Sequence, residues 1–281
     1  MSKKTFFDTL KHNMTVVSSC LTIFLSLGFT IFIYNPLTRI IAFIGLLLVI
    51  ICLAVIKSLF RRKKIKIIVK DKLEMEVFFH KYDEYHEFIF NSEDEDIFVV
   101  PVNRYFDTHI DDGIIQLNSN IGRIIQKYFS KKSDLVQLDE YIYKTLEEIP
   151  EKYEENINKK GKIRKYNIGT IVRHEIKGKE IYFLALTDVD IYNNSKSFCT
   201  PEMFCEAVNK LINYIDNHSE GKTVNMPLLG THKSRLKTTQ DIALNLLIDL
   251  FMISEHHLKN PIRIALSKKY NKLISLDRFQ K

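Results

Sequence analysis

The chain has 281 residues and a formal net charge of +7 at pH 7. Residues 1–66 hold ten basic and one acidic residue, a charge of +9, so residues 67–281 together carry −2. A slightly negative domain lacks the electrostatic footprint of a nucleic-acid-binding protein, and we expect no nucleic-acid partner. The four cysteines show no metal-binding or redox spacing, and we expect no metal site.

Two apolar stretches near the N-terminus predict a pair of transmembrane helices. No charged residue occurs from Asn13 to Thr38, and a second uncharged run extends from Ile40 to Ile56. A hydrocarbon core of ~30 Å requires about 20 such residues at a rise of ~1.5 Å per residue. Within the first run, Asn35-Pro36 favours a turn. We therefore expect spans at about 15–34 and 38–57.

The flanking charges predict the orientation of this hairpin. Lysine and arginine cluster before the first span and again after the second, where the sequence reads RRKKIK. Positive residues favour the cytoplasmic side, so both termini are expected there, in a multi-pass protein of the cytoplasmic membrane with the lipid bilayer as a partner. Two buried helices of a soluble protein are the alternative, which leaves the adjoining basic cluster without an explanation. The expected domains are therefore a hairpin at residues 1–64 and a cytosolic domain at residues 65–281.

The cytosolic domain is expected to be an α/β domain, because strand-like and helix-like patterns alternate along it. The expected strands are residues 65–69, 75–80, 96–102, 168–175, 180–187, 223–229 and 261–266. The expected helices are residues 119–129, 135–149, 201–217, 239–254 and a last one from Lys268. The charged segment 150–162 is expected to be an exposed loop. This alternation predicts three layers, α/β/α, around a mixed sheet.

Two loops that follow buried strands are the expected binding elements, because ligands bind at the carboxyl ends of strands in such sheets. The first loop, residues 103–115, offers an amide, aromatic faces and carboxylates. The second, residues 230–236, combines a glycine, hydroxyls and two cations ahead of a helix, which suits a phosphate group. An ordinary solvated turn is the alternative for the second loop. A metal cluster of Asp107, Asp111 and Asp112 is an alternative for the first, although no histidine or glutamate recurs around it at ligand spacing.

Three segments in order carry a resemblance to a known family: VVPVNRYFDTHIDDGII, NIGTIVRHEIKGKEIYFLALTDVD and VNMPLLGTHKSRL. Together they resemble the macro-like domain of effector proteins from the Thoeris anti-phage systems, over about residues 65–270. The FDT and DDGII elements are the most specific part. With an N-terminal hairpin, the resemblance is to the type II effectors of these systems.

The resemblance implies a ligand reader that is not an enzyme and has no cofactor. Its signal would be an ADP-ribose conjugate, expected to be histidine-ADP-ribose, made by a partner TIR-domain protein. Binding would assemble the effector into homo-oligomers that disrupt the inner membrane and cause abortive infection. The residues that the resemblance places around the distal ribose and its adduct are Asn103, Phe106, Asp107, Asp112, Gly113 and Ile114. Those that it places at the diphosphate are Gly230, Thr231, His232, Ser234 and Arg235.

Two other functions are consistent with the same sequence. The first is a membrane-anchored ADP-ribosyl hydrolase, in which Asn103, Asp107 or Asp112 would position a water molecule. No glycine triplet follows Asn103, which argues against this activity. The second is a non-catalytic membrane adaptor whose α/β domain binds only protein.

Overall fold

The computed structural model describes residues 44–45, 48–49, 51–52, 63–69, 73–92, 95–110, 114–149, 153–192, 196–231, 234–256 and 258–279. Two compact units divide the chain: Lys66–Lys268 is one, and Met1–Ile65 with Lys269–Lys281 is the other. In the second unit, residues 44–45, 48–49 and 51–52 are helical. The boundary predicted between residues 64 and 65 stays a prediction.

The prediction that the chain lies in the inner membrane is wrong. Among the described helices, none is both long and apolar enough to cross a bilayer. The predicted spans, about 15–34 and 38–57, lie outside the described residues except for three pairs within 44–52.

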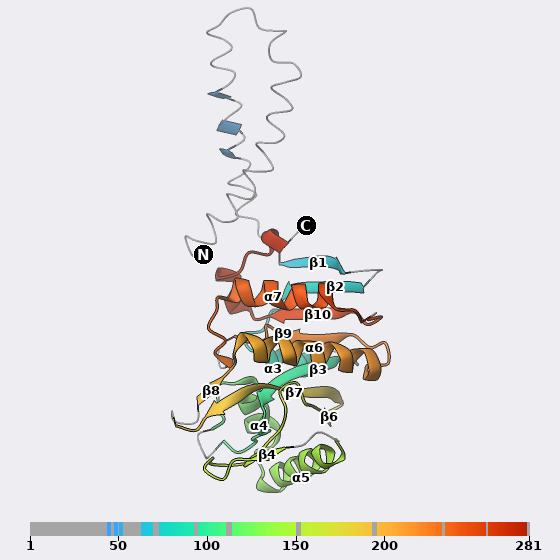
Figure 1. Ribbon diagram of the computed structural model, residues 1–281. Coiled ribbons are helices and arrows are strands. Elements are labelled where there is room, and N and C mark those ends of the chain that lie inside the picture. The colour runs from blue at the N-terminus through green and yellow to red at the C-terminus, as the bar shows by residue number, and fades with distance from the viewer. Residues whose placement is uncertain are drawn as a thin grey trace, which may run out of the picture. The chain divides into compact units, whose positions relative to one another are not determined.

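An eight-stranded mixed sheet forms the centre of the Lys66–Lys268 unit (Figure 1). Its order is β1 (Lys64–Val69), β2 (Leu73–Phe79), β10 (Ile262–Leu266), β9 (Val224–Pro227), β3 (Ile97–Asn103), β7 (Lys179–Asp190) and β6 (Ile171–Ile176), with β8 (Lys196–Phe198) paired to β7. The strands from β2 to β7 along this path pair in parallel, whereas β6 and β8 pair antiparallel to β7. The predicted mixed sheet is confirmed.

The central strands are buried on both faces. In β3, Phe98 and Val100 contribute to a core cluster that also contains Ile181 and Phe183 of β7. The intervening residues face the opposite side, because successive side chains of a strand alternate. Tyr182 accordingly packs edge-to-face against an aromatic ring of helix α6 (Pro201–His218), 5.1 Å between ring centroids. This explains why these strands read as continuous apolar runs.

Five helices cover the two faces of this sheet. They are α3 (Tyr85–Asn91), α4 (Asn120–Tyr128), α5 (Lys132–Glu148), α6 (Pro201–His218) and α7 (Gln240–Ile253). The first three contribute to the core cluster with Phe98, while α6 packs on the opposite face together with α7 (Figure 1). The side chains of Ser119, Thr200 and Thr239 cap α4, α6 and α7 by accepting hydrogen bonds from first-turn amides. The predicted three layers are present.

Several short elements were not predicted. Helix α3 has only seven residues, and β8 has only three, so each is shorter than the window over which its hydrophobic periodicity can be recognised. The segment predicted as an exposed loop contributes β4 (Glu154–Glu155), which pairs with β5 (Arg164–Lys165). The predicted last helix is instead two short 3-10 helices, η2 (Lys268–Lys272) and η3 (Leu276–Phe279).

Candidate functional site

A cleft lies where the two predicted binding loops meet. Strands β3 and β9 are parallel neighbours, so the loops that follow them leave the same edge of the sheet. The residues that line the cleft are Pro101, Val102, Asn103, Ile114, Ile115, Gln116, Ser119, Ile121, Thr187, Ser197 and Ser234. The start of α4 contributes Ser119. The hydroxyl groups of the lining belong to Ser119, Thr187, Ser197 and Ser234, which come from four different segments. Such a lining supplies many hydrogen-bond donors and acceptors in a concave site.

The structure brings some of the predicted residues together and separates others. Asn103, Ile114 and Ser234 line the cleft. Arg235 lines an adjacent pocket that shares Ser197 with the cleft. The remaining described residues are Phe106 and Asp107, both buried in the first loop, and Gly230 and Thr231, which form the turn of the second. Asp112, Gly113 and His232 lie outside the described residues. Ligand contact by the predicted residues stays a prediction.

Both loops hold a non-glycine residue in the left-handed backbone region. The φ angle is 52° at Phe106 and 50° at Arg235. This conformation is strained for residues with a Cβ, and it concentrates at ligand-binding and active sites. The surrounding structure stabilises both loops: Phe106 is 2 % exposed, and Leu236 N–H donates to the Gly230 carbonyl at 3.1 Å. The described parts of the two loops are therefore held in defined conformations.

Gly230 is required by the turn of the second loop. Its φ is 76°, and a Cβ atom there would lie 2.9 Å from side-chain atoms of both Phe204 and Leu236. Gly230→Ala is therefore expected to lower the free energy of unfolding by about 1–3 kcal/mol through strain and overpacking. Urea unfolding of the full chain would measure this loss. Gly178→Ala is the matched control, because Gly178 has a φ of 73° and no atom within 4 Å of the added Cβ. Equal losses in the two variants would contradict the packing argument at Gly230.

The pocket beside the cleft is predominantly basic. Lys165, Lys196, Arg235 and Lys237 line it, together with Asp188 and Asp190. Asp188 is engaged by Lys165 at 3.2 Å and by Arg104 at 3.3 Å. Within the described residues, no carboxylate pairs with the half-buried Arg235. A half-buried guanidinium in a basic pocket favours an anionic ligand.

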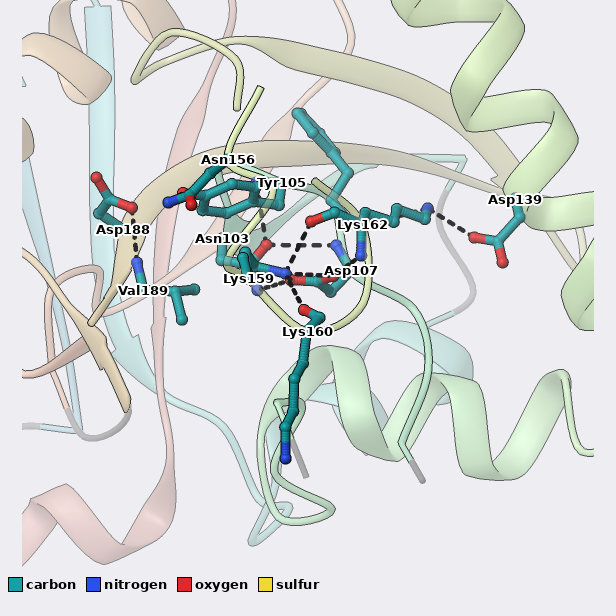
Figure 2. Close-up of polar contacts among 11 residues, drawn as sticks. Asn103, Tyr105, Asp107, Asp139, Asn156, Lys159, Lys160, Lys162, Asp188 and Val189 are labelled. Carbon is teal, nitrogen blue, oxygen red and sulfur yellow. Dashed lines mark hydrogen bonds and ion pairs between the residues drawn. The ribbon is translucent and has the colours of Figure 1, made fainter. Parts of the chain in front are cut away.

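Asp107 forms the centre of a buried polar cluster beneath the first loop (Figure 2). Its carboxylate accepts from Asn103 Nδ2 at 3.0 Å and from the Lys162 N–H at 3.0 Å. Lys159 Nζ lies 2.8 Å from Oδ2 and 3.0 Å from Oδ1. The Asn103 side-chain oxygen in turn accepts from the Tyr105 and Asp107 amides. These two side chains therefore organise their own loop.

Asp139 of α5 forms a second polar cluster with the same loop. It accepts a hydrogen bond from Thr108 Oγ1, and its carboxylate lies 3.0 Å from His109 Nε2 and 2.6 Å from Lys162 Nζ. Burial lowers the pKa of the Lys162 ammonium, and the charge of Asp139 opposes that shift. Figure 2 shows Lys162 directed towards Asp139, away from the Asp107 carboxylate. The first loop is thus tied to α5 as well as to segment 159–162.

The comparisons with known proteins decide the family. The model of the family described as "Thoeris protein ThsA, Macro domain" matches residues 88–267. The chain belongs to this family. The matched residues, 88–267, include both binding loops and both polar clusters. The recognition made from the three sequence segments is therefore confirmed for the ThsA macro domain.

Individual relatives are more distant from the chain. The Thoeris protein ThsA of Bacillus amyloliquefaciens (strain Y2) is 28% identical over 175 residues, which are 60% of this chain and 55% of that protein. The match thus spans about half the length of this curated ThsA relative. The Oceanobacillus iheyensis macrodomain with ADP aligns at 9% identity and a TM-score of 0.47, over 77% of this chain and 94% of that chain. A mutant of the same macrodomain aligns at 11% identity and a TM-score of 0.46, over 78% of this chain and 96% of that chain.

Sequence reasoning missed the basic side chains that hold the first loop of this ThsA macro domain. Segment 150–162 was predicted to be exposed, but Lys159 is 5 % exposed. Lys159, Lys160 and Lys162 stand in one lysine-rich run, and nothing in the sequence marks Lys159 as the buried member. Asp139 likewise occurs among the charged residues of an ordinary amphipathic helix. Only the tertiary structure distinguishes these residues from solvated charges.

Proposed function

We propose that the chain reads an ADP-ribose-type ligand for a Thoeris anti-phage defence system. One observation carries this proposal: Asn103, Ile114 and Ser234, taken from two loops far apart in the sequence, line one cleft at the carboxyl ends of β3 and β9. The cleft has a volume of about 60 Å³, which is too small for ADP-ribose alone, and the adjoining basic pocket of about 840 Å³ supplies the room and the positive charge for two phosphates. Family membership supports the ligand class, and the cleft geometry supports its location.

Each part of the cleft suits one part of the ligand. The hydroxyl of Ser234 and the guanidinium of Arg235 belong to the second loop, where a diphosphate needs hydrogen-bond donors and positive charge. Asn103 and Ile114 line the cleft from the first loop, where they would border the distal ribose. The start of α4 at Ser119 adds the positive end of a helix dipole to the same cleft.

The proposed role is binding without catalysis. A hydrolase would need a carboxylate or amide free to position water near the ribose. Asp107 is 4 % exposed, and its carboxylate is engaged by Asn103, Lys159 and the Lys162 amide. The Asn103 side chain is occupied by its own loop. At Asn103 and Asp107, these contacts favour a reader over the hydrolase alternative.

The biological signal and its consequence form the finer part of the proposal. The resemblance to Thoeris effectors suggests a conjugate, histidine-ADP-ribose, produced by a TIR-domain partner. Binding would then assemble several copies of the chain and lead to abortive infection. An action on the inner membrane is not proposed, because the described helices include none that could cross it.

Calorimetric titration of the full chain with ADP-ribose and with histidine-ADP-ribose tests this function. We expect saturable binding of both, tighter binding of the conjugate, and recovery of intact ligand when the mixture is analysed by mass spectrometry. Release of free ADP-ribose from the conjugate would establish a hydrolase instead. Absence of binding to either compound would favour the protein-binding adaptor.

A further inference from the structure

We propose that Lys159 and Lys162 form a clamp that fixes the first binding loop in its binding-ready conformation. The two-lysine clamp consists of Lys159 with Asp107 and Lys162 with Asp139. It joins residues 103–110 to segment 159–162 on one side and to α5 on the other (Figure 2). Neither lysine lines the cleft between the two loops. Both are positioning residues, acting through the loop that they hold.

The first half of the clamp is a fully buried ion pair. The side chain of Lys159 is 0 % exposed and that of Asp107 is 3 % exposed. Lys159 Nζ also donates to the carbonyls of Lys160 and Lys162, at 2.7 and 2.9 Å, and it lies 4.5 Å from the centre of the Tyr105 ring. All these partners are needed, because a buried ammonium is tolerated only when it is paired and hydrogen-bonded. Loss of either charge leaves the other uncompensated.

The second half of the clamp acts on the loop backbone. Lys162 Nζ donates to the carbonyl of Phe106 at 2.7 Å while it pairs with Asp139 at 2.6 Å. Phe106 has a positive φ, so the lysine binds the loop at a strained position. The Lys162 amide meanwhile donates to Asp107. One residue therefore connects the strained backbone, the buried carboxylate and α5.

Gly161 allows the two lysines to approach the loop so closely. Its φ is 80°, and a Cβ atom there would lie 2.8 Å from Ile114 Cδ1 and 2.9 Å from Asp107 Oδ1. The backbone of segment 159–162 thus packs directly against one residue of the cleft and one residue of the clamp. Segment 159–162 therefore contacts Ile114, a residue that lines the cleft.

The consequence for binding rests on the proposed function. A loop already held in its bound conformation loses less conformational entropy when the ligand binds. Without the clamp, the strained turn at Phe106 has fewer contacts to maintain it, and residues 103–110 would sample other conformations. Affinity for ADP-ribose should then fall, although no ligand contact has been removed.

Hydrogen exchange and ADP-ribose titration of the full chain test the clamp together. Lys159→Met keeps the apolar stem and removes the charge, and Lys160→Met is its matched control, because Lys160 is exposed and contributes only a backbone carbonyl. In Lys159→Met we expect amide exchange across residues 103–110 to accelerate by about tenfold or more, and ADP-ribose affinity to fall by a similar factor. Amides of β10 should keep their protection, and Lys160→Met should match the wild type.

Each alternative result has a definite meaning. Unchanged exchange across residues 103–110 in folded Lys159→Met, or an equal acceleration in β10, would overturn the clamp. Faster exchange with unchanged ADP-ribose affinity would overturn its role in binding. If Lys159→Met does not fold, Lys162→Met decides by the same readouts, since that side chain is 26% exposed. If the wild type does not bind ADP-ribose, the proposed function fails, and the exchange data still decide whether the clamp holds the loop.

Discussion

Phe204→Ala is expected to lower the free energy of unfolding by about 3–5 kcal/mol, the usual cost of deleting a buried aromatic ring. Phe204 lies on α6 and is fully buried. Its ring also packs beneath Gly230, where an added Cβ would lie 2.9 Å from it. The cavity would therefore open between α6 and the second binding loop, and we expect that loop to lose order together with the core.

Chemical unfolding of the full chain, followed by circular dichroism, would measure the effect of Phe204→Ala. Ile253→Ala is a suitable control, because Ile253 is 69% exposed and its truncation should cost less than about 0.5 kcal/mol. A loss below about 1 kcal/mol in Phe204→Ala would contradict the packing described here.

Arg235→Glu is expected to weaken ADP-ribose binding by about 2 kcal/mol or more, which is roughly 30-fold in the dissociation constant. The substitution replaces a charge-assisted contact to the diphosphate by repulsion. Arg235 is half-buried in the basic pocket and pairs with no carboxylate among the described residues, so the free protein should lose little stability. Isothermal titration with ADP-ribose would measure the change in affinity.

Two companion variants separate charge from backbone effects at Arg235. Lys177→Glu makes the same change of charge in the turn between β6 and β7, at the opposite edge of the sheet, and should leave affinity nearly unchanged. Arg235→Gly removes the charge but suits the φ of 50°, so it should lose affinity without losing stability. If Arg235→Glu bound as well as the wild type, Arg235 would not belong to the site.

The layers of the fold were predictable because local signals agree with the tertiary structure. Thr200 and Pro201 mark the start of α6 in the sequence, and the Thr200 side chain caps that helix. The apolar run from Ile97 to Val102 predicts a strand buried on both faces, and β3 is such a strand. The two binding loops follow from the same reasoning, because parallel strands place their carboxyl ends at one edge of the sheet.

The internal support of the site was not predictable in the same way. The positive φ angles of Phe106 and Arg235 depend on long-range packing, because neither residue type favours that region. Lys159 was expected to be solvated, as lysine usually is, and its burial depends on a carboxylate 52 positions away in the sequence. Sequence patterns reveal elements that repeat with a regular local spacing. A single ion pair between residues far apart in the sequence leaves no such repeat, so it cannot be recognised from the sequence.

The most direct test of the binding cleft is a crystal structure of the full chain with ADP-ribose. We expect the diphosphate within hydrogen-bond distance of the second loop near Ser234 and Arg235, and the distal ribose beside Asn103 and Ile114. The Lys159–Asp107 pair should keep the 2.8 Å contact that it has without ligand. ADP-ribose bound instead between α5 and residues 162–166, or an empty cleft at saturating ligand, would contradict the proposal that these two loops form the reading site.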